Sequence, residues 1–184
     1  MASHQFTVGT KSQKRTCTAT ATLLVGIEEA SIATSATIGK DIKVSWDRML
    51  HAEHSPVRTV TYRIRLDNIP SFVSTHLVRH KIGVEHFVQS LREDRGGKGD
   101  EDRWSPVCHT MTANAQALMN MARRRLCRKA SQETQDAMTA IRLAVHDIDA
   151  VLAQHLVPMC EYRGNTCHEF SSCGHRPHYT KPRK

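Results

Sequence analysis

A run of cationic and titratable side chains, Arg79-His80-Lys81, follows an apolar stretch near the middle of the chain. Ser90 and Arg92 come a few residues later, two positions apart. A hydroxyl and a guanidinium at this spacing can hold a phosphate, because arginine donates paired hydrogen bonds to anions. The alternative is a solvated cationic helix end, where positive charge offsets the helix dipole. The segment is therefore either an anion-binding site or a charged surface.

A second group of polar side chains interrupts a predicted helix over residues 113–128, which is otherwise rich in Ala, Leu and Met. Asn114 and Arg125 are eleven residues apart and return to nearly the same helix face. Gln116 and Asn120 are four apart and share a different face. Plain surface placement would explain them, but polar residues on two faces would also suit a binding site between subunits.

The elements that must position these groups follow from hydrophobic periodicity. Residues 58–66 alternate strictly between apolar and polar side chains, which predicts a half-exposed strand. Asp67-Asn68 can then cap a helix predicted over residues 70–81, where apolar side chains recur at helical spacing. The Arg79 motif would lie at the C-terminal end of this helix.

Further helices are predicted on either side of this unit. Residues 44–53 have a short helical pattern that ends before Pro56, and residues 131–155 have the longest one, ended by Pro158. Residues 1–40 contain only a weak strand signal, and residues 93–102 are a polar, glycine-rich loop. This order of elements predicts an α+β fold.

Length and charge limit the classes of function. The 184 residues suit one domain with an appendage, and the net charge of +8 favours anionic partners such as nucleotides. Aromatic residues make up only 5% of the chain, too few for a base-stacking platform, so nucleic acid is disfavoured as a partner. The sequence contains no run of about 18 apolar residues, so we expect no membrane span and a cytoplasmic location.

The chain has six cysteines, which in a cytoplasmic protein are thiols or metal ligands rather than disulfides. Three of them, Cys160, Cys167 and Cys173, lie close to several histidines in the C-terminal stretch. This combination can bind Zn²⁺, but spacings of seven and six residues lack the tight CxxC pattern. Reduced thiols in a loop are the favoured interpretation and zinc is the alternative. We expect residues 159–184 to form an extension with a disordered basic tail.

Several segments together resemble the flavin-dependent thymidylate synthases. That family has a signature of the form Arg-His-Arg-x-x-Ser-x-Asn-Glu-x-Ser-x-Arg. Arg79-His80-Lys81 and Ser90-Leu91-Arg92 match its two ends if one residue is inserted. The segment NAQALMNMARRRLCRKASQE follows a second family pattern without a gap, and His54 takes the place of a family histidine that precedes the strand. The matching segments span residues 51–155, in the family's order.

The resemblance implies an enzyme that binds FAD, which NADPH reduces, and that transfers a one-carbon unit from methylenetetrahydrofolate to C5 of dUMP. It also implies a catalytic domain over residues 1–158, in which a small sheet packs against long helices. Members of the family are homotetramers whose sites combine residues from several chains. In this family the cofactors supply the organic chemistry, and the protein supplies position and charge.

The resemblance further implies roles for individual residues. His54 would lie at the edge shared by flavin and folate, as one of two catalytic residues. Arg125, the other, would stabilise negative charge on the pyrimidine. FAD would be held by Arg79, His80, Lys81, Asn114, Gln116 and Asn120. The nucleotide would be held by His76, Ser90, Arg92 and Arg125.

The chain departs from the family pattern in several places. Lys81 replaces the third signature arginine, which keeps the charge and loses the planar fork. Val84 stands in place of a serine, and Gln116 in place of an arginine. The Asn-Glu pair is absent, with Glu85-His86 as a shifted substitute. Three alternatives therefore stay open. They are transfer of a hydroxymethyl group for modified DNA, as in a bacteriophage, an inactive nucleotide-binding relative, and a zinc-stabilised nucleic-acid-binding protein.

Overall fold

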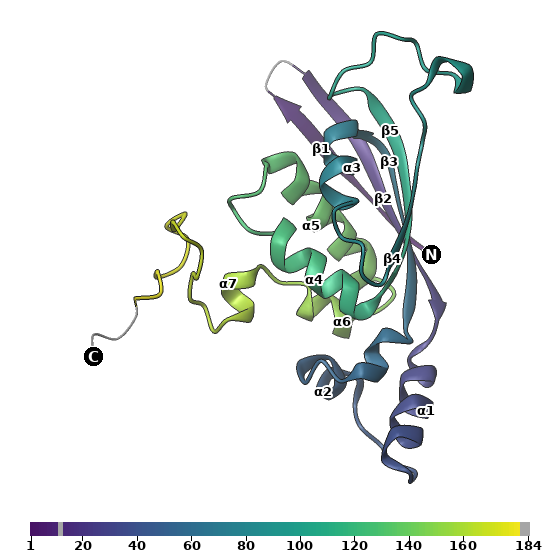
Figure 1. The fold of residues 1–184 in the computed structure, drawn as a ribbon, viewed down its shortest axis with the longest axis vertical. Coiled ribbons are helices and arrows are strands. Elements are labelled where there is room, and N and C mark those ends of the chain that lie inside the picture. The colour runs from purple at the N-terminus through teal and green to yellow at the C-terminus, as the bar shows by residue number, and fades with distance from the viewer. Residues whose placement is uncertain (11–12, 181–184) are drawn as a thin grey trace.

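The structure, a computed structural model, describes residues 1–10 and 13–180. Its centre is a five-stranded antiparallel sheet with the strand order β1-β2-β3-β5-β4 (Figure 1). The strands are β1 (Ala2–Thr10), β2 (Gln13–Val25), β3 (Thr61–Pro70), β4 (Val84–Val88) and β5 (Pro106–Asn114). In Figure 1, helices α3 to α6 lie on one side of this sheet, and α1 and α2 lie beyond its lower end.

The helices are α1 (Ile27–Ile38), α2 (Trp46–His51), α3 (Ser71–Leu77), α4 (Ala115–Arg125), α5 (Gln132–His146), α6 (Ala150–His155) and α7 (Met159–Tyr162). Two 3-10 turns, η1 (Ser55–Arg58) and η2 (Glu93–Arg95), complete the described elements. The predicted α+β class is confirmed. In the described part of the chain, none of the helices has the length and apolar character needed to cross a membrane.

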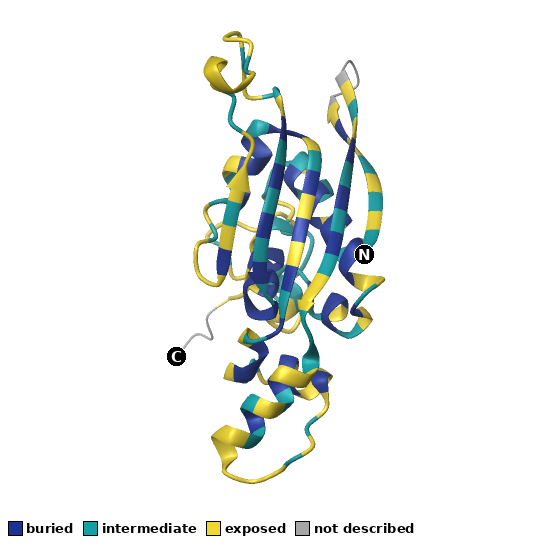
Figure 2. Ribbon diagram, turned by 90° about the vertical axis from the view of Figure 1, so that its right-hand side faces the viewer, coloured by how far each residue is buried: buried dark blue, intermediate teal, exposed yellow. Residues whose placement is uncertain are grey.

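The alternating stretch in the middle of the sequence forms β3, as predicted. Tyr62, Ile64 and Leu66 on one face are fully buried, whereas Arg63 and Arg65 on the other face are exposed. Figure 2 shows this alternation along the strands. Because successive side chains of a strand point to opposite faces, one face of the sheet packs on the core and the other carries polar side chains to solvent.

The first 40 residues contribute more structure than their weak strand signal predicted. β1 pairs with β2 from Ala2 opposite Ala21 to Thr10 opposite Gln13, and β2 also pairs with β3. Alternation of threonine with alanine in β2 buries Ala19 and Ala21 against α5, which packs across β1 and β2. Small side chains produce little hydrophobic contrast, so tertiary packing rather than periodicity identifies this strand.

Beyond β1, two further strands were missed, and the helices next to them are shorter than predicted. Residues 106–114 form β5, so the helix predicted over 113–128 begins at Ala115. Asn114 ends the strand and caps α4, because its side-chain oxygen accepts a hydrogen bond from the amide of Ala117 at 2.9 Å. Residues 84–88 form β4, the edge strand beside β5.

The helix predicted over residues 70–81 is confined to α3, and the predicted cap at Asp67-Asn68 is wrong. Both residues belong to β3, and Asn68 has a φ of 61°. Pro70 is the residue that precedes the helix. The Arg79 motif lies beyond the end of α3, in the turn that leads through Gly83 into β4.

The long helix predicted over residues 131–155 is two helices, α5 and α6, separated at residues 147–149. Asp149 lies at this break, where its carboxylate caps the N-terminus of α6 and accepts hydrogen bonds from the core. It accepts hydrogen bonds from the Leu152 amide at 2.8 Å, from Trp46 Nε1 at 2.9 Å and from the Tyr62 hydroxyl at 2.6 Å. Three segments of the core therefore meet at one buried carboxylate, which also raises the pKa of Tyr62 after the larger effect of burial.

Replacing Asp149 by Ala should lower the free energy of unfolding by about 2–4 kcal/mol, because two buried donors and a helix amide lose their acceptor. Urea unfolding followed by circular dichroism would measure the change. Asp147→Ala is the matched control in the same turn, since that carboxylate is half-exposed and pairs with His4. The control should cost less than about 1 kcal/mol, and equal costs for both variants would contradict this role of Asp149.

Candidate functional site

The turn after α3 and the first half of α4 enclose a surface cavity of about 340 Å³. Arg79, His80, Lys81 and Ile82 line it from the turn, and Ala117 and Asn120 line it from α4. Four of the six residues expected to hold a flavin dinucleotide, Arg79, His80, Lys81 and Asn120, are thus brought together from two segments of the chain.

Asn114 lies at the edge of the same region, and both its backbone and its side chain form hydrogen bonds within the fold. Its backbone amide donates to the Gly83 carbonyl at 3.0 Å, and its side-chain oxygen caps α4. Gly83 has a φ of 72°, and a Cβ there would fall 2.6 Å from the Asn114 side-chain nitrogen. Asn114 and Gly83 together determine how closely the Arg79 turn approaches α4.

Gln116 points away from this cavity and into a buried polar network. Its side-chain nitrogen donates to Glu53 Oε2 at 2.6 Å, and Glu53 forms a salt bridge with Arg123 at 2.5 Å. Burial raises the pKa of Glu53, but hydrogen bonds from Arg123, Tyr162 and Gln116 outweigh it and hold the pKa below its usual value. Gln116 therefore helps to anchor α4 to the segment before η1. Sequence reasoning missed Glu53, which lies outside any motif.

Arg125, at the end of α4, contacts the turn directly. Its Nε donates to His80 Nε2 at 3.0 Å. This bond requires the His80 ring to accept at Nε2, so the ring is neutral. Burial first, and then the charges of Arg125, His86 and Arg124, lower the pKa of His80 to about 4. The two residues that sequence analysis assigned to different ligands are in fact hydrogen-bonded neighbours.

His76, on α3, lies in the same electropositive environment. Its Nδ1 is 2.8 Å from the Thr134 hydroxyl. Burial lowers its pKa, as do the charges of Arg125, Arg79 and Arg103, while Glu133 has the opposite effect. Among the residues that the structure describes, neither Arg79, Lys81 nor Arg125 forms a salt bridge with a carboxylate. Arg125 is partly buried, whereas Arg79 and Lys81 are exposed, and cations without an acidic partner are suited to an anionic ligand.

Ser90 and Arg92 do not join this group within one chain. They follow β4, whereas the Arg79 turn precedes it, and five residues of strand span roughly 16 Å. The Ser90 hydroxyl accepts a hydrogen bond from the Arg92 amide at 3.3 Å, and the Arg92 guanidinium is bound to Asp94 at 2.8 and 2.9 Å. The two halves of the signature are therefore separate sites in the single chain.

His54 is half-exposed and precedes η1, where its carbonyl accepts a hydrogen bond from the Val57 amide. It follows Glu53, which has a φ of 48° and belongs to the Gln116 network. No side-chain hydrogen bond of His54 is found among the described residues. Its predicted role at a flavin edge remains a prediction.

Behind the turn runs a chain of hydrogen bonds that sequence analysis did not anticipate. His86 Nε2 is 2.7 Å from the His80 carbonyl, His86 Nδ1 is 3.0 Å from His109 Nε2, and His109 Nδ1 is 3.0 Å from the Ser74 hydroxyl. A carbonyl only accepts, so His86 donates to it, and in the neutral state His109 donates to His86 and Ser74 donates to His109. This relay holds the His80 backbone in place. Alternation in PVCHTMTAN, in which His109 occupies an inward position, was the available signal.

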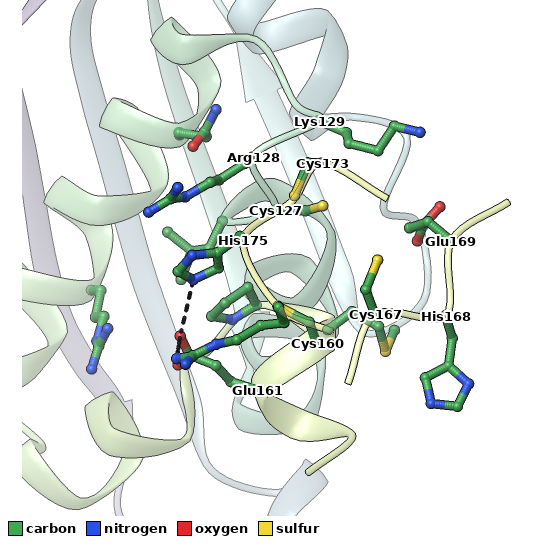
Figure 3. Close-up of a pocket in the computed structure, with 16 residues that line it drawn as sticks. Cys127, Arg128, Lys129, Cys160, Glu161, Cys167, His168, Glu169, Cys173 and His175 are labelled. Atoms are coloured by element: carbon green, nitrogen blue, oxygen red, sulfur yellow. Dashed lines mark hydrogen bonds and ion pairs between the residues drawn. The ribbon is translucent and has the colours of Figure 1, made fainter. Parts of the chain in front are cut away.

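The three cysteines proposed as metal ligands line one cavity of about 230 Å³, together with a fourth, Cys127, from the turn after α4 (Figure 3). Burial raises the pKa of the Cys160 thiol, and negative charge on Cys127 or Glu161 adds to that effect. Within the described residues, no three Cys, His, Asp or Glu side chains already stand at the spacing of a metal site. Cys127 was missed because it lies 33 residues before Cys160 in the sequence.

Comparisons with known proteins point to one fold. No protein-family model and no curated protein matches the sequence. Among solved structures, thymidylate synthase X from Helicobacter pylori with FAD and dUMP matches with a TM-score of 0.55 and 16% identity, over 73% of this chain and 99% of that one. A second structure of the flavin-dependent enzyme from the same organism, complexed with FAD and dUMP, matches with a TM-score of 0.59 and 14% identity, over 76% and 99% of the two chains.

The chain has the fold of a flavin-dependent thymidylate synthase. At these identities the likeness shows the fold alone. It confirms the architecture that the sequence resemblance implied, a small antiparallel sheet packed against helices, and it leaves the roles of individual residues as proposals.

The buried histidines predict how stability depends on pH. His80 and His109 have pKa values of about 4 in the fold against 6.5 for an ordinary histidine, with burial as the main cause for each. The unfolded chain therefore binds protons first as the pH falls. Each buried histidine should contribute fully to the free energy of unfolding above pH 6.5. That contribution should decline by roughly 1–3 kcal/mol as the pH falls from 6.5 to 4.

Urea unfolding at a series of pH values would measure this decline. His109→Gln should remove part of it, whereas His146→Gln, at an exposed ring on α5, should leave it intact. An unchanged pH dependence in the His109 variant would contradict the assignment.

Proposed function

We propose that this protein is a flavin-dependent enzyme that transfers a one-carbon unit from methylenetetrahydrofolate to C5 of dUMP, with FAD as cofactor and NADPH as reductant. One observation carries the proposal. Arg79, His80 and Lys81 converge with Asn120 and Arg125 of α4 into one electropositive site, within a fold whose solved examples hold FAD and dUMP.

The residues present suit a flavin dinucleotide. Its pyrophosphate is anionic, and the cavity offers Arg79 and Lys81 without carboxylate partners in the described residues. When bound, the flavin supplies the hydride that completes the new methyl group. The chain itself would bind and orient: Asn120 presents an exposed amide from α4, and the His86–His109 relay fixes the backbone beside His80.

Arg125 would act on the pyrimidine. Its guanidinium is partly buried, and burial followed by the charges of Arg79 and Arg124 lowers its pKa, so an anionic neighbour would stabilise it. Negative charge develops on the ring as C5 becomes nucleophilic, and a preorganised cation at that position lowers the barrier. The bond to His80 restricts the guanidinium to one orientation. His76 would contact the nucleotide from the adjacent face of α3.

Ser90 and Arg92 would hold the nucleotide phosphate in a site completed by another copy of the chain. The proposal follows from their separation from Arg125 by the length of β4. A homotetramer, as in the family that the sequence resembles, would bring them together. Arg92 would exchange Asp94, its partner in the single chain, for the phosphate. We assign this catalytic unit to residues 1–158 and treat residues 159–184 as an extension.

FAD uptake tests the cofactor assignment. The purified protein should bind FAD, seen as a shift in flavin absorbance or quenching of its fluorescence. Arg79→Ala should weaken binding about tenfold or more, because one charge-assisted hydrogen bond is lost. Arg63→Ala, on the exposed face of β3, is the matched control and should bind normally. A chain that folds but does not take up FAD would refute the proposed function.

Turnover of dUMP tests the substrate assignment. With FAD, NADPH and methylenetetrahydrofolate present, Arg125→Ala should reduce kcat/KM by about 100-fold, and Arg125→Lys should recover part of the loss because it keeps the charge. Mass spectrometry of the product distinguishes a methyl from a hydroxymethyl group. Normal turnover in Arg125→Ala would show that another residue contacts the pyrimidine.

A further inference from the structure

Four of the six cysteines gather where the C-terminal extension meets the end of α4. Cys127 comes from the turn between α4 and α5, and Cys160, Cys167 and Cys173 come from the extension. All four line the same cavity, and Figure 3 shows them arranged around it. The two remaining cysteines, Cys17 and Cys108, lie in β2 and β5. The four cysteines therefore lie around one cavity, although they come from segments distant in the sequence.

The extension has almost no hydrophobic core of its own. Between residues 159 and 180, Cys167 alone is buried, and the Phe170 side chain is fully exposed. The backbone is nevertheless folded around Cys167, whose amide donates to the Pro177 carbonyl and whose carbonyl accepts from the Tyr179 amide, both at 2.8 Å. A short segment that buries so little apolar surface needs a cross-link to compensate for its loss of conformational entropy.

The sulfur atoms are the groups available to form such a cross-link. All four are free thiols in the part of the chain that the structure describes. Of the nearby histidines, His178 donates from Nε2 to the Glu169 carbonyl at 2.7 Å, and His168 stacks on Tyr179. His175 lines the cavity with its Nε2 3.9 Å from the Glu161 carboxylate. A set of four cysteines is therefore a better ligand set than a mixed one with histidine.

The charge of the surroundings suits bound thiolates. Four thiolates around a divalent cation carry a net charge of −2, which positive neighbours stabilise. The same cavity is lined by Arg128, Lys129, Arg142 and Arg176. Lys129 also ties the two sides together, because its ammonium donates to the Ser171 carbonyl at 2.9 Å and to the Ser171 hydroxyl at 2.7 Å.

We propose that Cys127, Cys160, Cys167 and Cys173 bind one structural Zn²⁺ ion, which fastens the C-terminal extension to the end of α4. The four thiols release four protons and form four Zn–S bonds, with no change of oxidation state. The sulfurs are not yet at ligand spacing, so their side chains rotate inward on binding. Cys127 lies two residues after Arg125. The ion would thus also stabilise the helix end that carries this arginine, but the site does not depend on the proposed function.

Metal content of the full-length chain tests the proposal. Protein purified under reducing conditions should contain about one zinc ion per chain by elemental analysis. Replacing any one of the four cysteines by Ser should remove most of the zinc and lower Tm, whereas Cys108→Ser in β5 should keep both. Wild-type protein that stays without zinc after incubation with zinc salt would overturn the proposal, as would zinc loss in the Cys108 variant alone.

Thiol protection in the wild-type chain keeps the test independent of whether the variants fold. Alkylation followed by peptide mass analysis should find the four cysteines protected with zinc and labelled after chelation, with Cys108 labelled equally in both. Equal labelling of the four cysteines with and without zinc would overturn the site. Disulfides among them under reducing conditions, or visible absorbance of an iron–sulfur cluster, would also overturn it. None of these readouts involves FAD or dUMP, so their failure leaves the catalytic proposal untouched.

Discussion

The pairing of β5 with both β3 and β4 is the constraint on which the rest of the site depends. β3 leads into α3 and β5 leads into α4, and Val84 at the start of β4 lies opposite Ala113 near the end of β5. The chain that leaves α3 must therefore return to the start of α4 before it can enter the sheet edge. The hydrogen bond from the Asn114 backbone amide to the Gly83 carbonyl joins the end of this turn to the start of α4. The Arg79 turn lies beside α4 because backbone hydrogen bonds in the sheet place it there.

The site that results is electrostatically costly in the single chain. The charges of Arg125 and Arg79 lower the pKa of His76, the charge of Arg79 lowers that of Arg125, and the charge of Arg125 lowers that of His80. Burial is the larger cause in each case and acts in the same direction. The fold accommodates this by keeping His80 neutral and by bonding it to Arg125. Elsewhere it neutralises buried charge directly, as Glu53 does for Arg123. Arg123 is thus neutralised within the chain, whereas the described residues supply no carboxylate partner to Arg79 or Arg125, the cations proposed to bind an anionic ligand.

The stability of the C-terminal extension is limited by how little apolar surface it buries. α7 contributes Tyr162, whose ring lies 3.6 Å beneath the Arg123 guanidinium, so the extension begins on the same α4 network that anchors Gln116. Beyond α7 the chain buries Cys167 and little else. Hydrophobic burial cannot hold such a segment, and hydrogen bonds to Lys129 and a weak surface ion pair between Arg124 and Glu169 are modest contributors. Sulfur ligation would supply what the core does not.

The sequence alone determined the β3 strand, α2, the α+β class and the resemblance that the fold comparison supports, because these rest on local periodicity and on motif order. The family resemblance also grouped Arg79, His80 and Lys81 with Asn120, because these residues fall at matching positions of its two motifs. Only the tertiary structure revealed that Asp149 divides α5 from α6, that His109 and His86 brace the Arg79 turn, and that Cys127 joins the three C-terminal cysteines. Each of these depends on at least one partner 23 or more residues away in the chain. Local sequence pattern does not predict such partners, because the pairing of strands and the packing of helices determine which distant residues meet.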